Sequence, residues 1–76
     1  MKKVNIKTEY ITLGQLLKFL SITGSGGETK IFLSEYEIKV NGEIEKRRGK
    51  KLRPRDVIEI EDNGNFEIEW YWTPSR

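Results

Sequence analysis

The 76-residue chain contains neither cysteine nor histidine. These absences exclude disulfides, thiolate zinc sites, cysteine nucleophiles and imidazole bases. The first residues, MKKVNIKTEY, hold no apolar run long enough for a signal peptide or a membrane span. We therefore expect a cytoplasmic protein that does not interact with membranes. Because no nucleophile with its base and no metal set can be assembled, we also expect no enzyme activity, no metal or other cofactor and no small-molecule substrate.

Net charge is also low, at +2, but the positive charges are unevenly distributed. Residues 46–55, KRRGKKLRPR, hold seven of the fourteen basic residues, and we call them the basic segment. Its charged members are Lys46, Arg47, Arg48, Lys50, Lys51, Arg53 and Arg55. A polyanion responds to a local excess of charge rather than to the net charge. A charge run can also be a solvated loop, but this density, with Gly49 and Pro54 keeping the segment out of the core, favours polyanion binding.

Residues 56–69, by contrast, carry six acidic residues and no basic one. We therefore expect one positive and one negative face. The regular i, i+2 spacing of Glu59, Glu61, Glu67 and Glu69 is typical of a solvated sheet face rather than of a metal site. An acidic region beside the basic segment would repel a phosphate backbone and so orient it.

Two short helices are predicted in the first half of the chain. Thr12 can cap a helix over residues 13–20, because Gln15 stands at the capping-box position and leucines follow at helical spacing. A turn at residues 23–27, rich in glycine, ends this helix. Ser25 can cap a second helix, with Glu28 at its capping-box position and an apolar stripe of Thr29, Phe32, Leu33 and Tyr36. The turn lacks the pattern of a nucleotide P-loop, so it either only reverses the chain or also holds a phosphate.

Apolar residues alternate with polar ones in four stretches, which predicts strands there. The first is an edge strand near the N-terminus. The second leads into the Asn41-Gly42 turn, a strong hairpin signal, after which Ile44 continues the apolar period. A third strand follows Pro54, and a turn at residues 62–65 leads to the last one. The apolar positions are Val4 and Ile6, Ile38 and Val40, Val57, Ile58 and Ile60, and Phe66, Ile68, Trp70 and Trp72.

The last strand is unusually aromatic. Alternation places Phe66, Trp70 and Trp72 on one face, where they serve either the core or a dimer contact, or stack unpaired bases. Tyr71 lies on the other face, and we expect it to be exposed. The order strand, helix, helix and then a run of strands is typical of an α+β domain.

Several motifs, taken in order, resemble the S4 RNA-binding domain. They are SGGETK at the second helix, the VNG turn at residues 40–42 and the ending RRGKKLRPRDVI. The chain is most similar to the small stand-alone S4-like proteins of the YaaA and YbcJ type in bacteria. The resemblance implies an S4-like (αL) fold, with two short helices packed on a small antiparallel sheet. We expect one domain over residues 1–76, with a core at about residues 12–61 and a C-terminal strand extension at residues 62–76.

This chain departs from the family at several customary RNA contacts. Where many S4 domains begin the first helix with R-L-D, residues 12–14 read TLG, and where the second helix often begins S-R-S-E-A-R-R, residues 25–31 read SGGETKI. Lys30 keeps one basic position, while Ile31 replaces the next. We expect the main-chain amides at Gly26 and Gly27 to hold a phosphate instead, because a helix start presents unpaired donors at a positive dipole end.

The resemblance implies non-catalytic binding of structured RNA, above all ribosomal RNA or a ribosomal subunit, in ribosome assembly, maturation or association. Lysine and arginine bind phosphates by releasing counterions, and arginine can grip a phosphate with two donors. Two alternatives remain open: a DNA-binding protein, or an adaptor that docks an acidic protein through the basic segment. The predicted RNA-binding set comprises the seven basic residues of that segment with Lys18, Lys30, Lys39, Gly26 and Gly27.

Overall fold

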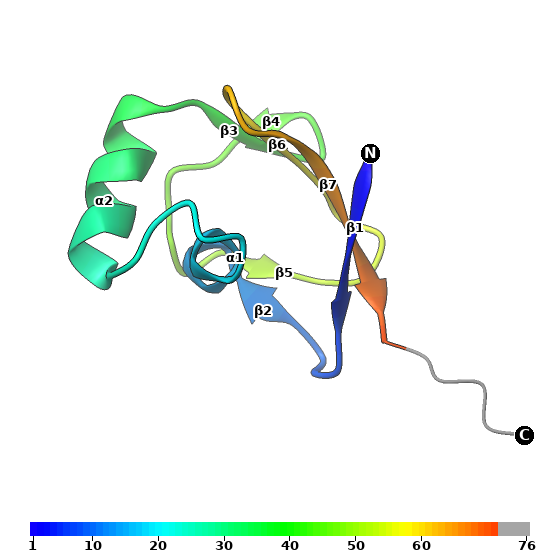
Figure 1. Cartoon of the computed structure of the whole chain (residues 1–76). Coiled ribbons are helices and arrows are strands. Elements are labelled where there is room, and N and C mark those ends of the chain that lie inside the picture. Colours follow the sequence, from blue (N-terminus) through cyan, green and yellow to red (C-terminus); the bar gives the residue numbers. More distant parts are fainter. Residues whose placement is uncertain (72–76) are drawn as a thin grey trace, which may run out of the picture.

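The computed structural model describes residues 1–71. Its elements follow in the order β1 (Lys2–Ile6), β2 (Ile11–Thr12), α1 (Leu13–Phe19), α2 (Gly26–Glu35), β3 (Ile38–Val40), β4 (Glu43–Ile44), β5 (Lys51–Leu52), β6 (Val57–Ile60) and β7 (Gly64–Trp70). Figure 1 shows them from the N-terminal strand in blue to β7 in orange. The predicted order of strand, helix, helix and strands is confirmed, and two short strands, β2 and β5, are added to it.

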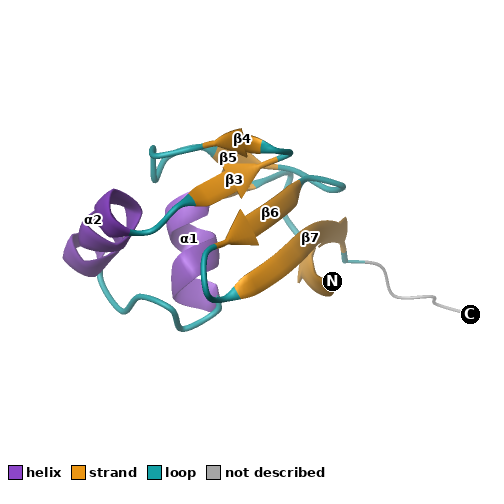
Figure 2. Cartoon of the chain, turned by 90° about the horizontal axis from the view of Figure 1, so that it is seen from above, coloured by secondary structure: helices purple, strands orange, loops and turns teal. Residues whose placement is uncertain are grey.

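Five strands form one sheet in the order β1-β7-β6-β3-β4. The helices group beside this sheet (Figure 2), and the α+β class is confirmed. The four strands from β7 to β4 are antiparallel, as expected, but β1 joins the edge parallel to β7, so the sheet is mixed. Alternation of apolar residues sets which face of a strand is buried and says nothing about its direction. A separate antiparallel pair, β2 with β5, lies next to α1.

Local capping signals set the start of α1. The Thr12 hydroxyl accepts a hydrogen bond from the main-chain amide of Gln15 at 3.2 Å, and the Gln15 side chain accepts one from the amide of Thr12 at 2.8 Å. This reciprocal capping box confirms the prediction. The helix then buries its apolar face completely, through Leu13, Leu16 and Leu17.

The second helix also begins at its predicted cap. Ser25 accepts a hydrogen bond from the amide of Glu28, but the Glu28 carboxylate returns to the amide of Gly24 rather than to that of Ser25. Thr29 is fully buried on the inner face. Its hydroxyl bonds to the carbonyl of Ser25 at 2.9 Å and to the hydroxyl of Thr23 at 2.8 Å, so this buried polar group is satisfied.

The last described strand lies inside the sheet. β7 pairs with β6 on one edge and β1 on the other, and it buries Phe66 and Ile68 in the core that the helices share. Residues 64–70, expected as part of a C-terminal extension, therefore form an inner strand of the sheet. Trp70 is 53% exposed although its neighbour in β1, Ile6, is buried, and Tyr71 is exposed as expected. Trp72 lies outside the described residues.

Two further residues differ from expectation. Ile44 is exposed, because the register pairs it with Lys39 and so places it on the outer face of the sheet. Leu52 is fully buried although it belongs to the basic segment. It lies in β5, opposite Ile11 of β2, so the segment is not a loop held entirely outside the core. No helix within residues 1–71 is long and apolar enough to cross a bilayer.

Candidate nucleic-acid interface

The basic segment is held against the start of α1 by its own main chain. The amide of Leu13 donates to the carbonyl of Lys50 at 2.8 Å, and the amide of Gly14 donates to the carbonyl of Arg48 at 2.9 Å. These amides belong to the first helical turn and have no partner inside the helix. The segment's main chain therefore faces the helix, and with Leu52 as a buried anchor it is a fixed support for its charged side chains.

Gly14 lies where the basic segment packs against α1. A Cβ atom at this position would lie 3.4 Å from both the Cβ and the carbonyl oxygen of Arg48, and 3.6 Å from the Cγ2 of Thr29. These are ordinary van der Waals distances for a Cβ atom, so a side chain that extends beyond Cβ would push the basic segment away from α1. This contact of Gly14 was not predicted from the sequence. The one signal for it was a glycine in the first turn of a short helix.

Arg48 links the basic segment to the second helix. One of its terminal guanidinium nitrogens donates to the carbonyl of Gly26 at 3.1 Å. Gly26 and Gly27 form the first turn of α2, and their amides have no hydrogen-bond partner among residues 1–71. The arginine therefore lies beside two unpaired donors. The structure thus brings Arg48 and the glycine-rich helix start together.

Most of the predicted basic side chains line three adjacent hollows. Lys18 and Arg48 line the first, of about 400 Å³, and Lys30, Lys46 and Arg48 line the second, of about 380 Å³. The third, of about 460 Å³, is lined by five residues of the basic segment: Arg47, Gly49, Lys50, Lys51 and Arg53. Because Arg48 joins the first two hollows and Gly49 joins the first to the third, the basic side chains form one connected surface from α2 to β5.

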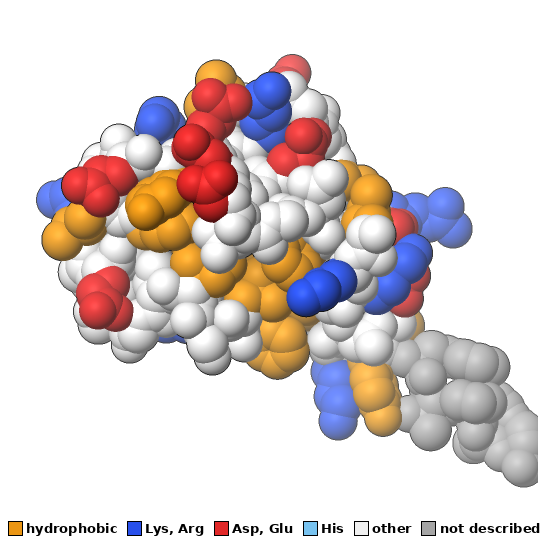
Figure 3. Space-filling view, turned by 45° about the horizontal axis from the view of Figure 1, so that its top comes forward, with side chains coloured by type: hydrophobic (Ala, Val, Ile, Leu, Met, Phe, Trp, Pro, Cys, Tyr) orange, Lys and Arg blue, Asp and Glu red, His pale blue; other side chains and the backbone are white. Residues whose placement is uncertain are grey.

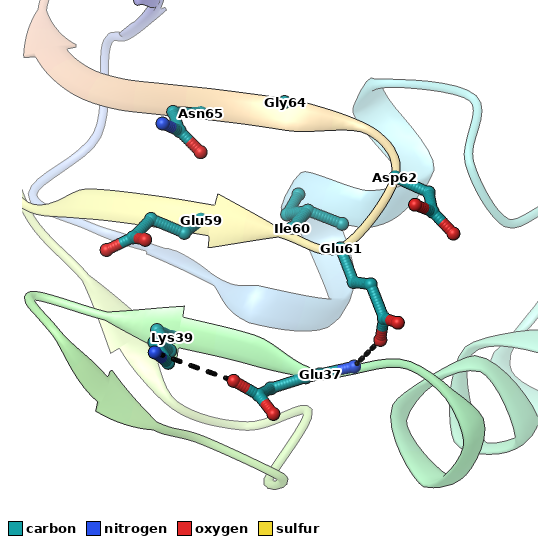
Figure 4. A pocket seen from close by; sticks show the side chains of 8 residues that line it. All are labelled: Glu37, Lys39, Glu59, Ile60, Glu61, Asp62, Gly64 and Asn65. Atoms are coloured by element: carbon teal, nitrogen blue, oxygen red, sulfur yellow. Dashed lines mark hydrogen bonds and ion pairs between the residues drawn. The ribbon is translucent and has the colours of Figure 1, made fainter.

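Two predicted residues lie away from this surface. Lys39 projects from the outer face of the sheet and forms an ion pair with Glu37 at 3.6 Å (Figure 4). Arg55 lies in the turn before β6, where its amide donates to the carbonyl of Ile68 at 2.7 Å and its φ is +82°. It lines none of the three hollows.

The guanidinium group of Arg47 already binds a carboxylate of the same protein. Its Nε lies 3.0 Å from one oxygen of Glu45, and a terminal nitrogen lies 3.3 Å from the other. The Glu45 carboxylate also accepts the main-chain amides of Lys46 and Arg47. The guanidinium of Arg47 and these amides lower the pKa of Glu45 to about 2. The pair fixes the direction of Arg47, whose remaining N–H groups can still reach a phosphate.

The outer face of the sheet is acidic. Glu37, Glu59, Glu61 and Asp62 line a hollow of about 470 Å³ there, with Lys39 as its basic member (Figure 4). In Figure 3 acidic side chains gather at the top of the molecule. The outer face of the sheet and the connected basic surface therefore differ in the sign of their charge.

The chain belongs to the S4 domain family. The family model described as "S4 domain" matches residues 4–69, which confirms the resemblance seen in the sequence. This span begins within β1 and ends one residue before the end of β7, so the match includes part of every strand of the five-stranded sheet.

A curated bacterial protein is closely similar. The "Probable ribosome maturation protein RlbA" of Bacillus subtilis (strain 168) is 52% identical over 65 residues, which cover 86% of this chain and 92% of that relative. The aligned region is therefore nearly the whole length of that relative.

Proposed function

We propose that this protein binds structured RNA, without catalysing a reaction, as a factor in ribosome maturation in the cytoplasm. Its ligand in this proposal is ribosomal RNA, free or in an assembling ribosomal subunit. Membership of the S4 family and the similarity to a probable ribosome maturation protein support this role. The observation that carries it is the connected basic surface between α2 and β5.

The mechanism that we propose is a phosphate clamp. Lys18 and Arg48 lie at the start of α2, and Lys30 lies one turn further along the helix. These three residues bind one stretch of RNA backbone, with the amides of Gly26 and Gly27 as uncharged donors. Lys46 and the residues of the third hollow bind a second stretch. Arginine suits this task because its planar guanidinium pairs with two phosphate oxygens at once.

Recognition in such a clamp depends on shape. An RNA double helix hides its base edges in a deep and narrow major groove, so a protein surface reads the spacing of phosphates and 2′-hydroxyls. A basic segment fastened to α1 holds its charges at fixed spacing, as this mode of recognition requires. We leave Lys39 and Arg55 out of the clamp because neither lies on the connected surface.

Replacement of clamp residues tests the proposal. The fourfold variant at Arg47, Arg48, Lys50 and Lys51, each changed to alanine, should retain the fold and bind a ribosomal RNA fragment more weakly. A plot of log affinity against log salt concentration has a negative slope. Each lost phosphate contact should reduce the magnitude of this slope by up to about 0.9. Fluorescence anisotropy over a range of salt concentrations measures both effects. An unchanged affinity and slope would overturn the clamp.

Two comparisons separate RNA from the other ligand classes. Duplex DNA of the same length should bind more weakly than structured RNA at equal salt. Crosslinking in cells, followed by sequencing, should recover ribosomal RNA. A preference for DNA, or capture of a protein partner that survives nuclease treatment without any RNA crosslink, would contradict the proposal.

A further inference from the structure

A largely apolar groove lies outside the proposed clamp. It has a volume of about 590 Å³ and runs between β1, the loop at residues 7–10 and α1. Val4, Ile6 and Ile11 contribute to its wall. Phe19, the last residue of α1, completes the wall and is 68% exposed, although aromatic side chains of this size are usually mostly buried.

Tyr10 joins this groove to the basic segment. Its side chain lines the groove, and the Nζ of Lys51 lies 5.0 Å from the centre of its ring. The guanidinium carbon of Arg53 lies 5.5 Å from the same centre. Both distances are within the range of a cation–π contact, so the ring holds the two cations beside it. The groove therefore begins where the charged surface ends, with one aromatic residue between them.

This arrangement fits an unpaired nucleotide. A nucleotide carries an anionic phosphate next to a flat aromatic base, and here two cations adjoin an apolar groove with an exposed phenyl ring. Asn5 and Gln15 bring amide groups to the groove, and amides can donate to or accept from a base edge. The groove also contains one residue of each charge, Lys7 and Glu9, so the excess positive charge comes from Lys51 and Arg53.

Other RNA elements and protein segments match less of the site. A paired base is stacked inside its helix and cannot enter a groove, whereas bulges and loops present bases that can. An apolar peptide would fill the groove but leave the two neighbouring cations unmatched.

We infer that the groove is a subsite for one unpaired nucleotide of the bound RNA, with its phosphate at Lys51 and Arg53 and its base packed on Phe19. The inference rests on the proposed function, because it assigns the groove to the same RNA ligand. It extends that function from a clamp that reads backbone shape to one that also selects RNA with a bulged or looped nucleotide beside the helix.

Two RNA hairpins test this subsite. One carries a single 2-aminopurine bulge, and the other is identical without the bulge. Wild-type protein should bind the bulged hairpin more tightly and change the 2-aminopurine fluorescence. Phe19→Ala should weaken binding of the bulged hairpin roughly fivefold or more, as expected for loss of one base–aromatic stack, and should leave the other hairpin unchanged. Because Phe19 is exposed, this variant should fold normally, which circular dichroism checks.

Matched variants separate the subsite from a general effect. Phe19→Tyr keeps a ring and should restore tight binding of the bulged hairpin. Ile44→Ala removes a similarly exposed apolar residue from the outer face of the sheet and should bind both hairpins as wild type does. Equal behaviour of Phe19→Ala and wild type on the bulged hairpin, or an equal loss on both hairpins, would overturn the subsite. Failure of wild-type protein to bind either hairpin at low salt would instead overturn the proposed function.

Discussion

The two helices use the amides of their first turns differently. In α1 the amides of Leu13 and Gly14 bind carbonyls of the basic segment. In α2 Ser25 caps the amide of Glu28, while those of Gly26 and Gly27 have no partner within residues 1–71. One helix start thus organises the protein's own chain, and the other is available to a ligand. The difference separates the residues that build the interface from those that we propose contact RNA.

The largest effect should come from disturbing the start of α1. Gly14→Val places a branched side chain where a Cβ already lies 3.4 Å from Arg48, so the free energy of unfolding should fall by about 1–3 kcal/mol. RNA affinity should fall as well, because the basic segment moves. Gly49→Ala is the control, since a Cβ there meets nothing within 4 Å, and it should change stability by less than about 0.5 kcal/mol. Urea unfolding measures both, and equal stabilities would refute the role of Gly14.

A smaller effect, confined to binding, should come from the start of α2. Gly26→Pro removes one unpaired amide at the first helical position, which tolerates proline, and Ser25 before it is already extended at φ −148° and ψ 168°. Stability should stay near that of wild type, while RNA affinity falls roughly threefold to tenfold, as for loss of one typical hydrogen bond of about 0.5–1.5 kcal/mol.

Gly26→Ala is the matched control for this change. It also places a Cβ near the Arg48 guanidinium, 3.1 Å from the terminal nitrogen, but it keeps the amide. The two variants should therefore differ in RNA affinity. Equal affinities in an anisotropy titration would show that the amide of Gly26 does not contact the ligand.

The ion pair between Glu45 and Arg47 also holds the beginning of the basic segment. Its contribution to the free energy of unfolding should depend on pH. Because the pKa of Glu45 is lowered to about 2 in the folded protein, its pair with Arg47 stabilises the fold above about pH 4.5 and is lost as the pH falls toward 2. Arg47 is 77% exposed, so the loss should be about 1 kcal/mol or less. Unfolding of wild type and Glu45→Gln at pH 5 and pH 2 measures it. The variant should lose less stability on acidification, and identical losses would contradict the assignment.

The smallest effect should come from the acidic face. Lys39→Ala removes a lysine that pairs with Glu37 on the outer face of the sheet, away from both helix starts. RNA affinity should change by less than about twofold, since most exposed ion pairs contribute little and this one adjoins no clamp residue. A loss as large as that of a clamp residue would place RNA on the outer face of the sheet.

The features that could be predicted from the sequence are local ones. The Thr12–Gln15 capping box, the Ser25 cap and the Asn41-Gly42 turn each depend on residues within a few positions of one another. The concentration of charge in the basic segment is equally local, so most of the candidate surface could be named residue by residue.

The features that could not be predicted depend on contacts between distant residues. The role of Gly14 requires Arg48 to lie against it, and the role of Tyr10 requires β5 to pair with β2. Alternation with the buried Ile38 and Val40 places Lys39 on the outer face of the sheet, but only the folded structure shows that the connected basic surface lies elsewhere. The burial of Leu52 could not be predicted for a different, local reason. Its neighbours in the sequence are charged, so the segment reads as exposed although Leu52 faces the core.

The parallel pairing of β1 with β7 has a consequence for biosynthesis. Lys2 lies opposite Phe66, and Ile6 lies opposite Trp70, so these contacts join residues 64 positions apart. Contacts of such long range slow folding, because a large loop must close before they form. The N-terminal strand must therefore wait for its partner until a ribosome has translated nearly the whole domain. If the proposed function holds, the sheet of a protein that serves new ribosomes closes only after a ribosome has translated residue 70.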